Sequence, residues 1–168
     1  MANQAWIGQP TTKNTTATIR SGLAYYVDSP ADRFVEAIEE EPDAYVRMVL
    51  ATRALRHDPG CIEAHLEMAA YLEDGDARMA HLSKAIETGE HLWQPVIESR
   101  SGDPAWWAVS ATRPYMRAIH SMGVLHKENG ETADARICFE QLLEMNPNDN
   151  QGIRELVAQL DNAAVFSM

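Results

Sequence analysis

The chain has 168 residues, which is enough for one domain that buries a sizeable hydrophobic core. Its 25 acidic and 14 basic residues give a formal net charge of −11, so it would be repelled by phosphate backbones and we expect no nucleic-acid partner. Its apolar runs are far shorter than the ~18–20 residues that a membrane span requires, so we expect no membrane insertion.

Residues 1–27 are rich in Thr, Asn, Gln and Gly, and they show no helical period. We therefore predict a flexible or peripheral arm, which Trp6 and Ile7 would dock onto the domain. In the alternative, ordered structure begins at Leu23–Val27 and packs on the first helix. The N-terminus lacks the basic and apolar regions of a secretion signal, so a cytoplasmic location is expected.

The first helix is predicted over Pro30–Glu40, because Ser29 suits the N-cap and proline suits the first helical position. A second helix is predicted over Tyr45–Leu55, stopped by Asp58-Pro59. Cys61–Trp93 predicts another two helices with Gly75 at their turn. Cys61 and Cys138 both fall on apolar helical faces, so we expect free thiols in a reducing compartment.

Residues 94–113 interrupt this pattern as an insertion. It opens at Pro95, continues as a polar loop over Ser99–Pro104, and then places Trp106 and Trp107 side by side. Two adjacent side chains cannot point the same way on a regular element, so we expect one to plug a gap and the other to be exposed as a binding anchor. The alternative is that both are buried.

The clearest unit is Met116–Asp149, two amphipathic helices joined at Asn129-Gly130 and stopped by Asn146-Pro147. Gly123 and Ala135 are small enough to let the helix axes approach within about 8–10 Å. A short final helix is predicted over Gln151–Leu160, followed by a tail of residues 163–168.

This unit resembles the tetratricopeptide repeat (TPR), a helix-turn-helix of roughly 34 residues. The matching positions are Met122, Gly123, His126, Ala135, Phe139 and Pro147, and upstream Tyr71, Leu82 and Ala85. The resemblance implies an all-α fold, an α-α superhelix (TPR-like solenoid) of about three helix pairs plus a C-terminal capping helix, over residues 28–162. Against the repeat length, the helix after Gly75 looks about two residues short.

A narrower resemblance joins AWW, TRPYMRA and NPNDNQGIR to a group of bacterial TPR-like proteins, and it implies no activity. In physical terms, Thr112 would cap a helix that begins at Pro114, and Asn146–Asn150 would stop one helix and cap the next. The alternative is a ligand site formed by Arg113, Arg117 and that turn.

The family implies a scaffold that binds a protein or peptide segment in a concave groove. Its clamp for C-terminal carboxylates is absent, because the clamp positions hold His65 with Ala69 and His120 with Val124. The partner is not identified, and a self-assembling homo-oligomer such as a homodimer is the alternative. The candidate partner-binding residues are Trp106, Trp107, Arg113, Arg117, His65, Leu72, His120, Val124 and Lys127.

No pattern of catalytic residues stands out. None of the six histidines forms the His-Glu-x-x-His metal motif, and no glycine-rich phosphate loop occurs. Glu87 and His91 have metal-compatible spacing on a helix, which arises often by chance on an acidic helix. We therefore expect no enzyme activity, no cofactor and no metal, with a metal-dependent enzyme as the remote alternative.

Overall fold

The computed structural model describes residues 29–99 and 105–166, and all its regular elements are helices. The arm predicted for residues 1–27 and residues 100–104 of the predicted loop lie outside this part. The long helices are α2 (Asp32–Glu40), α3 (Ala44–His57), α4 (Ile62–Tyr71), α5 (Gly75–Ser99), α7 (Arg113–Glu128), α8 (Thr132–Met145) and α9 (Ile153–Phe166). Between α5 and α7 lie the single turn α6 (Ala105–Ala108) and the 3₁₀ helix η3 (Ser110–Thr112).

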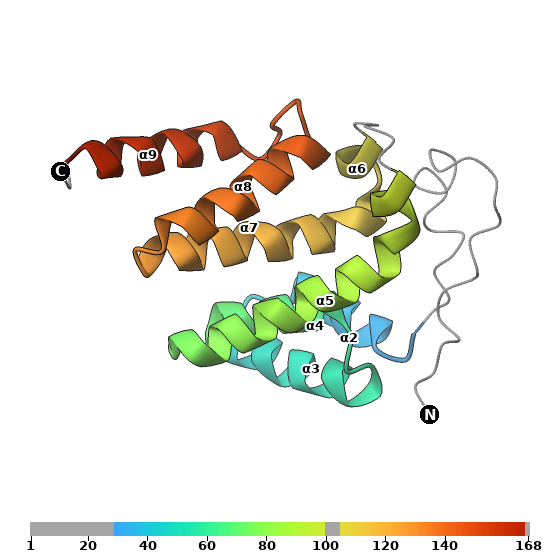
Figure 1. The fold of residues 1–168 in the computed structure, drawn as a ribbon. Coiled ribbons are helices and arrows are strands. Elements are labelled where there is room, and N and C mark those ends of the chain that lie inside the picture. The colour runs from blue at the N-terminus through green and yellow to red at the C-terminus, as the bar shows by residue number, and fades with distance from the viewer. Residues whose placement is uncertain (1–28, 100–104, 167–168) are drawn as a thin grey trace.

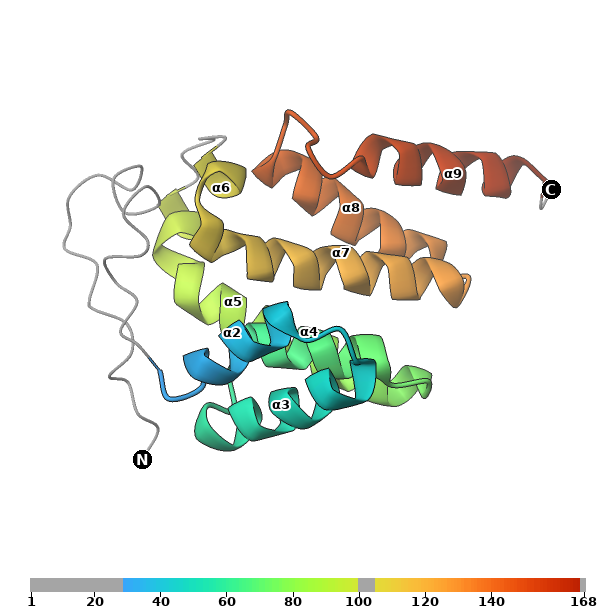
Figure 2. The same cartoon turned by 180° about the vertical axis from the view of Figure 1, so that it is seen from behind.

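Each long helix packs chiefly against the long helices next to it in the chain, from α2 against α3 to α8 against α9. Figures 1 and 2 show the result as a stack that runs from α3 at one end to α9 at the other. The most extensive packing between long helices that are not consecutive is that of α4 with α7, which are separated by α5. The prediction of an all-helical fold is confirmed for the described residues.

The start of the first helix differs slightly from the prediction. Pro30 and Ala31 form a turn, and α2 begins at Asp32. In this turn the Ser29 N–H donates to the Asp32 carboxylate at 2.6 Å, and the Ala31 N–H donates to Ser29 Oγ at 3.1 Å. These reciprocal bonds satisfy backbone donors that the first helical turn leaves without partners.

The prediction of a shortened helix after Gly75 is wrong. Helix α5 has 25 residues, and it continues past Pro95 into the segment predicted as an insertion. Leu92 and Trp93 lengthen its apolar stripe by another turn and pack against the main core. Gly75 itself is the first residue of α5.

The last helix also exceeds its prediction, with 14 residues from Ile153 to Phe166. The Asp149 carboxylate accepts the N–H of Ile153 at 2.6 Å and the N–H of Arg154 at 3.0 Å. Asp149 and Gly152 have φ values of 53° and 72°, which turn the chain sharply before α9. The segment after α8 is therefore a stop and cap, in agreement with the first interpretation of its sequence.

The largest core lies between α7, α8 and the end of α5. Tyr115, Phe139 and Leu142 are completely buried there. A Cβ atom on Gly123 would lie 2.5 Å from Phe139 Cε1, so this crossing of α7 and α8 needs glycine. The expectation that Gly123 allows close approach is confirmed.

The core between α2, α3 and α4 is built from smaller side chains. Its buried members are Ala31, Ile38, Ala51, Ala54, Cys61 and Ala64. Cys61 is a buried free thiol, and Cys138, on α8, is a half-buried one. Small side chains bury less apolar area than aromatic ones, so hydrophobic burial stabilises this end of the stack less than it stabilises the largest core.

Candidate functional site

A cavity of about 220 Å³ lies where α2, α4 and the start of α7 meet. We call it the acidic pocket, and its lining residues are Asp32, Val35, Glu36, Glu63, Ser110, Ala111 and Pro114. They come from three segments that are far apart in the sequence. Figure 2 shows α2 and α4 next to one another, with α7 beside them.

The pocket wall combines three carboxylates with an apolar surface. Asp32 and Glu36 lie one turn apart on α2, and Glu63 approaches from α4. Val35, Ala111 and Pro114 supply the apolar part. The lining contains no basic residue, so the pocket has a negative potential that favours a cation.

Glu63 is a half-buried carboxyl whose pKa is shifted. Burial raises the pKa of its carboxyl above the usual value, and the negative charges of Asp32 and Glu39 act in the same direction. The Glu63 backbone N–H and the positive charge of Arg117 oppose the rise. Within the described residues, Glu63 forms no ion pair at 4.0 Å or less, so its charge is only partly compensated.

Local sequence explains how the walls are positioned. Glu63 is in the first turn of α4, where the helix dipole favours a negative side chain. Next to Ser110 and Ala111 of the opposite wall, Thr112 is completely buried, and its hydroxyl lies 2.8 Å from the Val109 carbonyl and close to the Trp106 carbonyl as well. The hydroxyl therefore fixes η3 and does not cap α7, contrary to the expectation from the sequence. The reason is that Thr112 has helical backbone angles, with φ −87° and ψ −19°, whereas an N-cap residue whose side chain caps a helix is typically extended.

The two predicted tryptophans have different environments. Trp106 is 8% exposed, and its ring packs edge-on against Trp93 with centroids 6.2 Å apart. Trp107 is half-buried, and the Arg113 guanidinium lies 5.0 Å from the centre of its ring. Arg113 also donates to the Trp107 carbonyl at 3.0 Å, so both groups are already engaged with each other.

His65 does not face an open groove. It is 7% exposed, its Nε2 lies 3.0 Å from the Pro59 carbonyl, and its Nδ1 lies 2.8 Å from His81 Nδ1 on α5. A carbonyl only accepts, so His65 Nε2 donates to it, and the neutral Nδ1 accepts the proton of His81 Nδ1. Both ring nitrogens are used internally, which does not fit the expectation of a partner contact.

The other predicted residues are spread along the stack. Leu72 follows the last turn of α4, Val124 packs against the main core, and the His120 ring lies 6.4 Å from that of Phe139. Lys127 bonds to Gln159 of α9. Arg117 is exposed one turn after Pro114, and it is the member of the predicted set that lies beside the acidic pocket.

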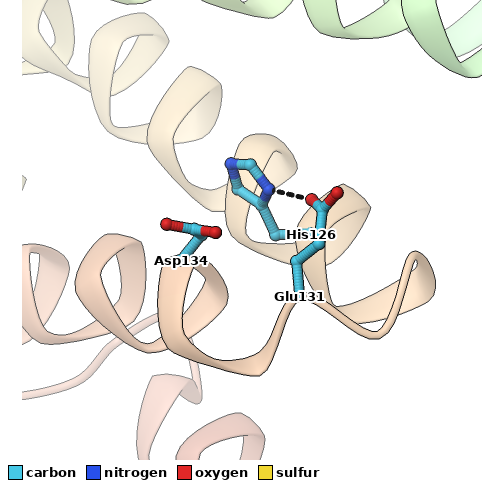
Figure 3. Close-up of side chains that lie close together, drawn as sticks. All are labelled: His126, Glu131 and Asp134. Atoms are coloured by element: carbon cyan, nitrogen blue, oxygen red, sulfur yellow. Dashed lines mark hydrogen bonds and ion pairs between the residues drawn. The ribbon is translucent and has the colours of Figure 1, made fainter.

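Sequence reasoning missed a second cluster, His126, Glu131 and Asp134 at the turn between α7 and α8 (Figure 3). One ligand atom from each lies within 4.8 Å of the others, a set that could hold a metal ion. His126 Nδ1 pairs with Glu131 Oε2 at 2.5 Å. The histidine ends one helix and the carboxylates begin the next, an arrangement that the helix dipoles alone favour.

Glu36 and Glu63 were also missed as site residues. Each is an ordinary acidic position on an amphipathic helix in a chain with 25 acidic residues, so nothing local marks it. The signal is the packing of α4 against α7, which the sequence places far apart. Asp32 was noted only as a helix-start residue.

Comparison of the chain with protein-family models, with curated proteins and with solved structures found no significant match in any of the three. No helix in the described part of the chain is both long enough and apolar enough to cross a membrane.

Proposed function

We propose that the chain is a TPR-like solenoid that binds a segment of a partner protein across its first helices α2, α4 and α7. In this proposal α2–α3, α4–α5 and α7–α8 are the helix pairs, and α9 caps the last one. The sequential packing of the helices and the glycine-dependent crossing of α7 and α8 support this assignment.

The observation that carries the functional proposal is the acidic pocket. Three helices that would be equivalent in a repeat array contribute the same end to a single cavity, the N-terminal end of α2, α4 and α7. A segment that crosses these helices would contact all three in succession, which is how arrays of helices bind extended chains.

The experiment that tests this function is selection of a random 12-residue peptide display library on the full-length protein. We expect enrichment of peptides that bind the wild type and lose affinity for Glu36→Lys. Glu36 is exposed, so its substitution reverses a pocket charge without disturbing the core. Glu144→Lys on α8, an equally exposed site outside the pocket, is the matched control.

The result that would contradict the proposal is a selection without enrichment, or enriched peptides that bind wild type, Glu36→Lys and Glu144→Lys equally. Light scattering at two protein concentrations tests the alternative of a homodimer, which stays a prediction. The absence of enzyme activity and the cytoplasmic location also stay predictions.

A further inference from the structure

We infer that His126, Glu131 and Asp134, at the turn between α7 and α8, bind a Zn²⁺ ion (Figure 3). We call these three residues the turn triad. The triad lies at the opposite end of α7 from Pro114 and the acidic pocket, so the inference does not rest on the proposed function. It departs from the expectation of no metal, which considered only the spacing of motifs along the chain.

The three side chains converge from two helices and the turn that joins them. One ligand atom from each lies within 4.8 Å of the other two, and the described residues hold no other set of three histidine, cysteine or acidic side chains as close together. Ligand atoms that lie ~2.0–2.2 Å from a tetrahedral zinc ion are ~3.4 Å from one another. Because Glu131 and Asp134 are exposed, small rotations of their side chains close the remaining distance.

The backbone of the turn fixes two of these ligands relative to each other. The Glu131 N–H donates to the His126 carbonyl at 2.8 Å, and the Gly130 N–H donates to the Lys127 carbonyl at 3.1 Å. With Gly130 at a φ of 78°, this pair of bonds is the Schellman motif, which ends a helix in a defined geometry. Asp134 follows in the first turn of α8. The ion would therefore find its ligands on an ordered backbone, which lowers the entropic cost of binding.

The chemistry of the ligands selects zinc. Imidazole nitrogen and carboxylate oxygen are both ordinary zinc ligands, whereas Mg²⁺ and Ca²⁺ prefer sites made only of oxygen. A neutral histidine with two carboxylates carries two negative charges, which one divalent cation neutralises. The formal net charge of −11 on the chain also attracts cations to its surface.

The contact already present within the triad is one that zinc can replace. His126 Nδ1 lies 2.5 Å from Glu131 Oε2, so the Nδ1 proton is shared with a carboxylate oxygen. A neutral histidine can carry its proton on Nε2 instead, which leaves the Nδ1 lone pair for the metal. The dipole of α8 favours acidic residues in its first turn, but it does not bring the ring of a second helix to them. The convergence of a half-buried histidine on two carboxylates is the observation that points to a metal.

Three protein ligands leave a zinc ion with an open coordination position. Structural zinc sites are closed by four protein ligands, and sites with three keep a position for water or another molecule. The turn triad belongs to the second kind. We therefore expect zinc to bind reversibly to a chain that is already folded, because the cores on either side of the turn do not depend on the ion.

The test is calorimetric titration of zinc chloride into metal-free, full-length protein that carries no affinity tag, at about pH 7.5, where histidine is neutral. We expect saturation at one zinc ion per chain. The same titration in an excess of Ca²⁺ should give nearly the same affinity, because a histidine nitrogen is a poor ligand for Ca²⁺. Circular dichroism should show the same helix content with and without a chelator.

Variants with matched controls locate the site. Asp134→Asn and His126→Gln each remove one ligand, and we expect each to weaken zinc binding at least about tenfold. Asp134 is exposed, so its variant gives a reading that does not depend on how His126→Gln folds. Glu140→Gln, at an exposed position on α8, and His91→Gln, at an exposed position on α5, should bind zinc like wild type. His91→Gln also removes the histidine that pairs with a carboxylate at metal-compatible spacing.

Three results would overturn the inference. The first is the absence of saturable zinc binding to wild type, and the second is equal binding to wild type, Asp134→Asn and His126→Gln. The third is a loss of affinity in excess Ca²⁺, which would identify an acidic surface that attracts any divalent cation. The peptide selection on Glu36→Lys concerns the other end of α7, so its outcome is independent of these.

Discussion

The α7–α8 junction is filled by Tyr115, Phe139 and Leu142, whereas the junction of α2, α3 and α4 is filled mainly by alanines. The first junction closes around Gly123 and leaves no room for a Cβ atom. The second borders the acidic pocket. The comparison indicates that large apolar residues fill the core at one junction, while small residues at the other border a cavity with acidic lining residues.

The largest expected effect comes from emptying the closed junction. Phe139→Ala removes a completely buried ring, and we expect it to lower the free energy of unfolding by about 3–5 kcal/mol. Urea denaturation followed by circular dichroism measures this change. Phe34 at the other junction is half-buried, so Phe34→Ala should lower the free energy of unfolding by less. An equal or larger loss for Phe34→Ala would contradict the difference between the two junctions.

Filling the glycine site should have the next largest effect. Gly123→Leu inserts a side chain where even Cβ would meet Phe139 Cε1 at 2.5 Å, so we expect a loss of about 1–3 kcal/mol. Gly75→Ala is the control, because nothing lies within 4 Å of its Cβ position and alanine favours the helix. A melting temperature that fell for Gly75→Ala and not for Gly123→Leu would contradict the conclusion that the crossing of α7 and α8 needs glycine at position 123.

A pH dependence should follow from the buried histidines. Burial lowers the pKa of His65, His81 and His120, and the charge of His65 lowers that of His81 further. The unfolded chain, with histidine pKa near ~6.5, then binds more protons than the folded chain. The contribution of these neutral histidines to stability is therefore fully present above about pH 6.5. It is lost as the pH falls from there through the folded pKa values.

Melting temperatures at about pH 7.5 and pH 5.5 measure this dependence. We expect a smaller difference between the two values in His65→Gln than in wild type. The exposed His91 gives the matched control, and His91→Gln should keep the wild-type difference. An unchanged difference in His65→Gln would mean that the His65–His81 pair does not contribute to the titration.

The smallest expected change in stability is at the acidic pocket. Glu63→Gln removes a carboxyl whose pKa is raised by burial, so at neutral pH its lost hydrogen bonding is offset by relief of charge desolvation. We expect a free energy of unfolding within ~0.5 kcal/mol of wild type.

A carboxyl with a raised folded pKa stabilises below the unfolded pKa, and this contribution is lost as the pH rises. Glu63→Gln should therefore flatten the stability profile above about pH 4.3. A loss of more than ~2 kcal/mol would show that Glu63 itself stabilises the fold. The two junctions would then differ in which residues stabilise them, apolar at one and acidic at the other.

Much of the fold is readable from local patterns. The proline and glycine stops near α3 and α8, the apolar stripe with Phe139, and the small residue at position 123 are all short-range signals. The length of α5 was not predicted, because Pro95 is an ordinary helix-stop signal and the packing of Leu92 and Trp93 overrides it.

The candidate site was much less accessible from sequence. Trp107 is conspicuous as one of two adjacent tryptophans and Arg113 as a cation of the TRPYMRA block, and yet the two side chains contact each other. Glu36 and Glu63 share a pocket because α4 reaches α7, a tertiary contact that leaves no trace in the period of either helix. Arg117 belongs to the predicted partner-binding residues, and its positive charge acts on Glu63 of that pocket.

The most direct test of the central claim is calorimetric titration of the most enriched library peptide into wild type, Glu36→Lys and Glu144→Lys. The account predicts one site per chain, at least about tenfold weaker binding to Glu36→Lys, and unchanged binding to Glu144→Lys. Equal dissociation constants for all three proteins would contradict the assignment of the acidic pocket as the binding site.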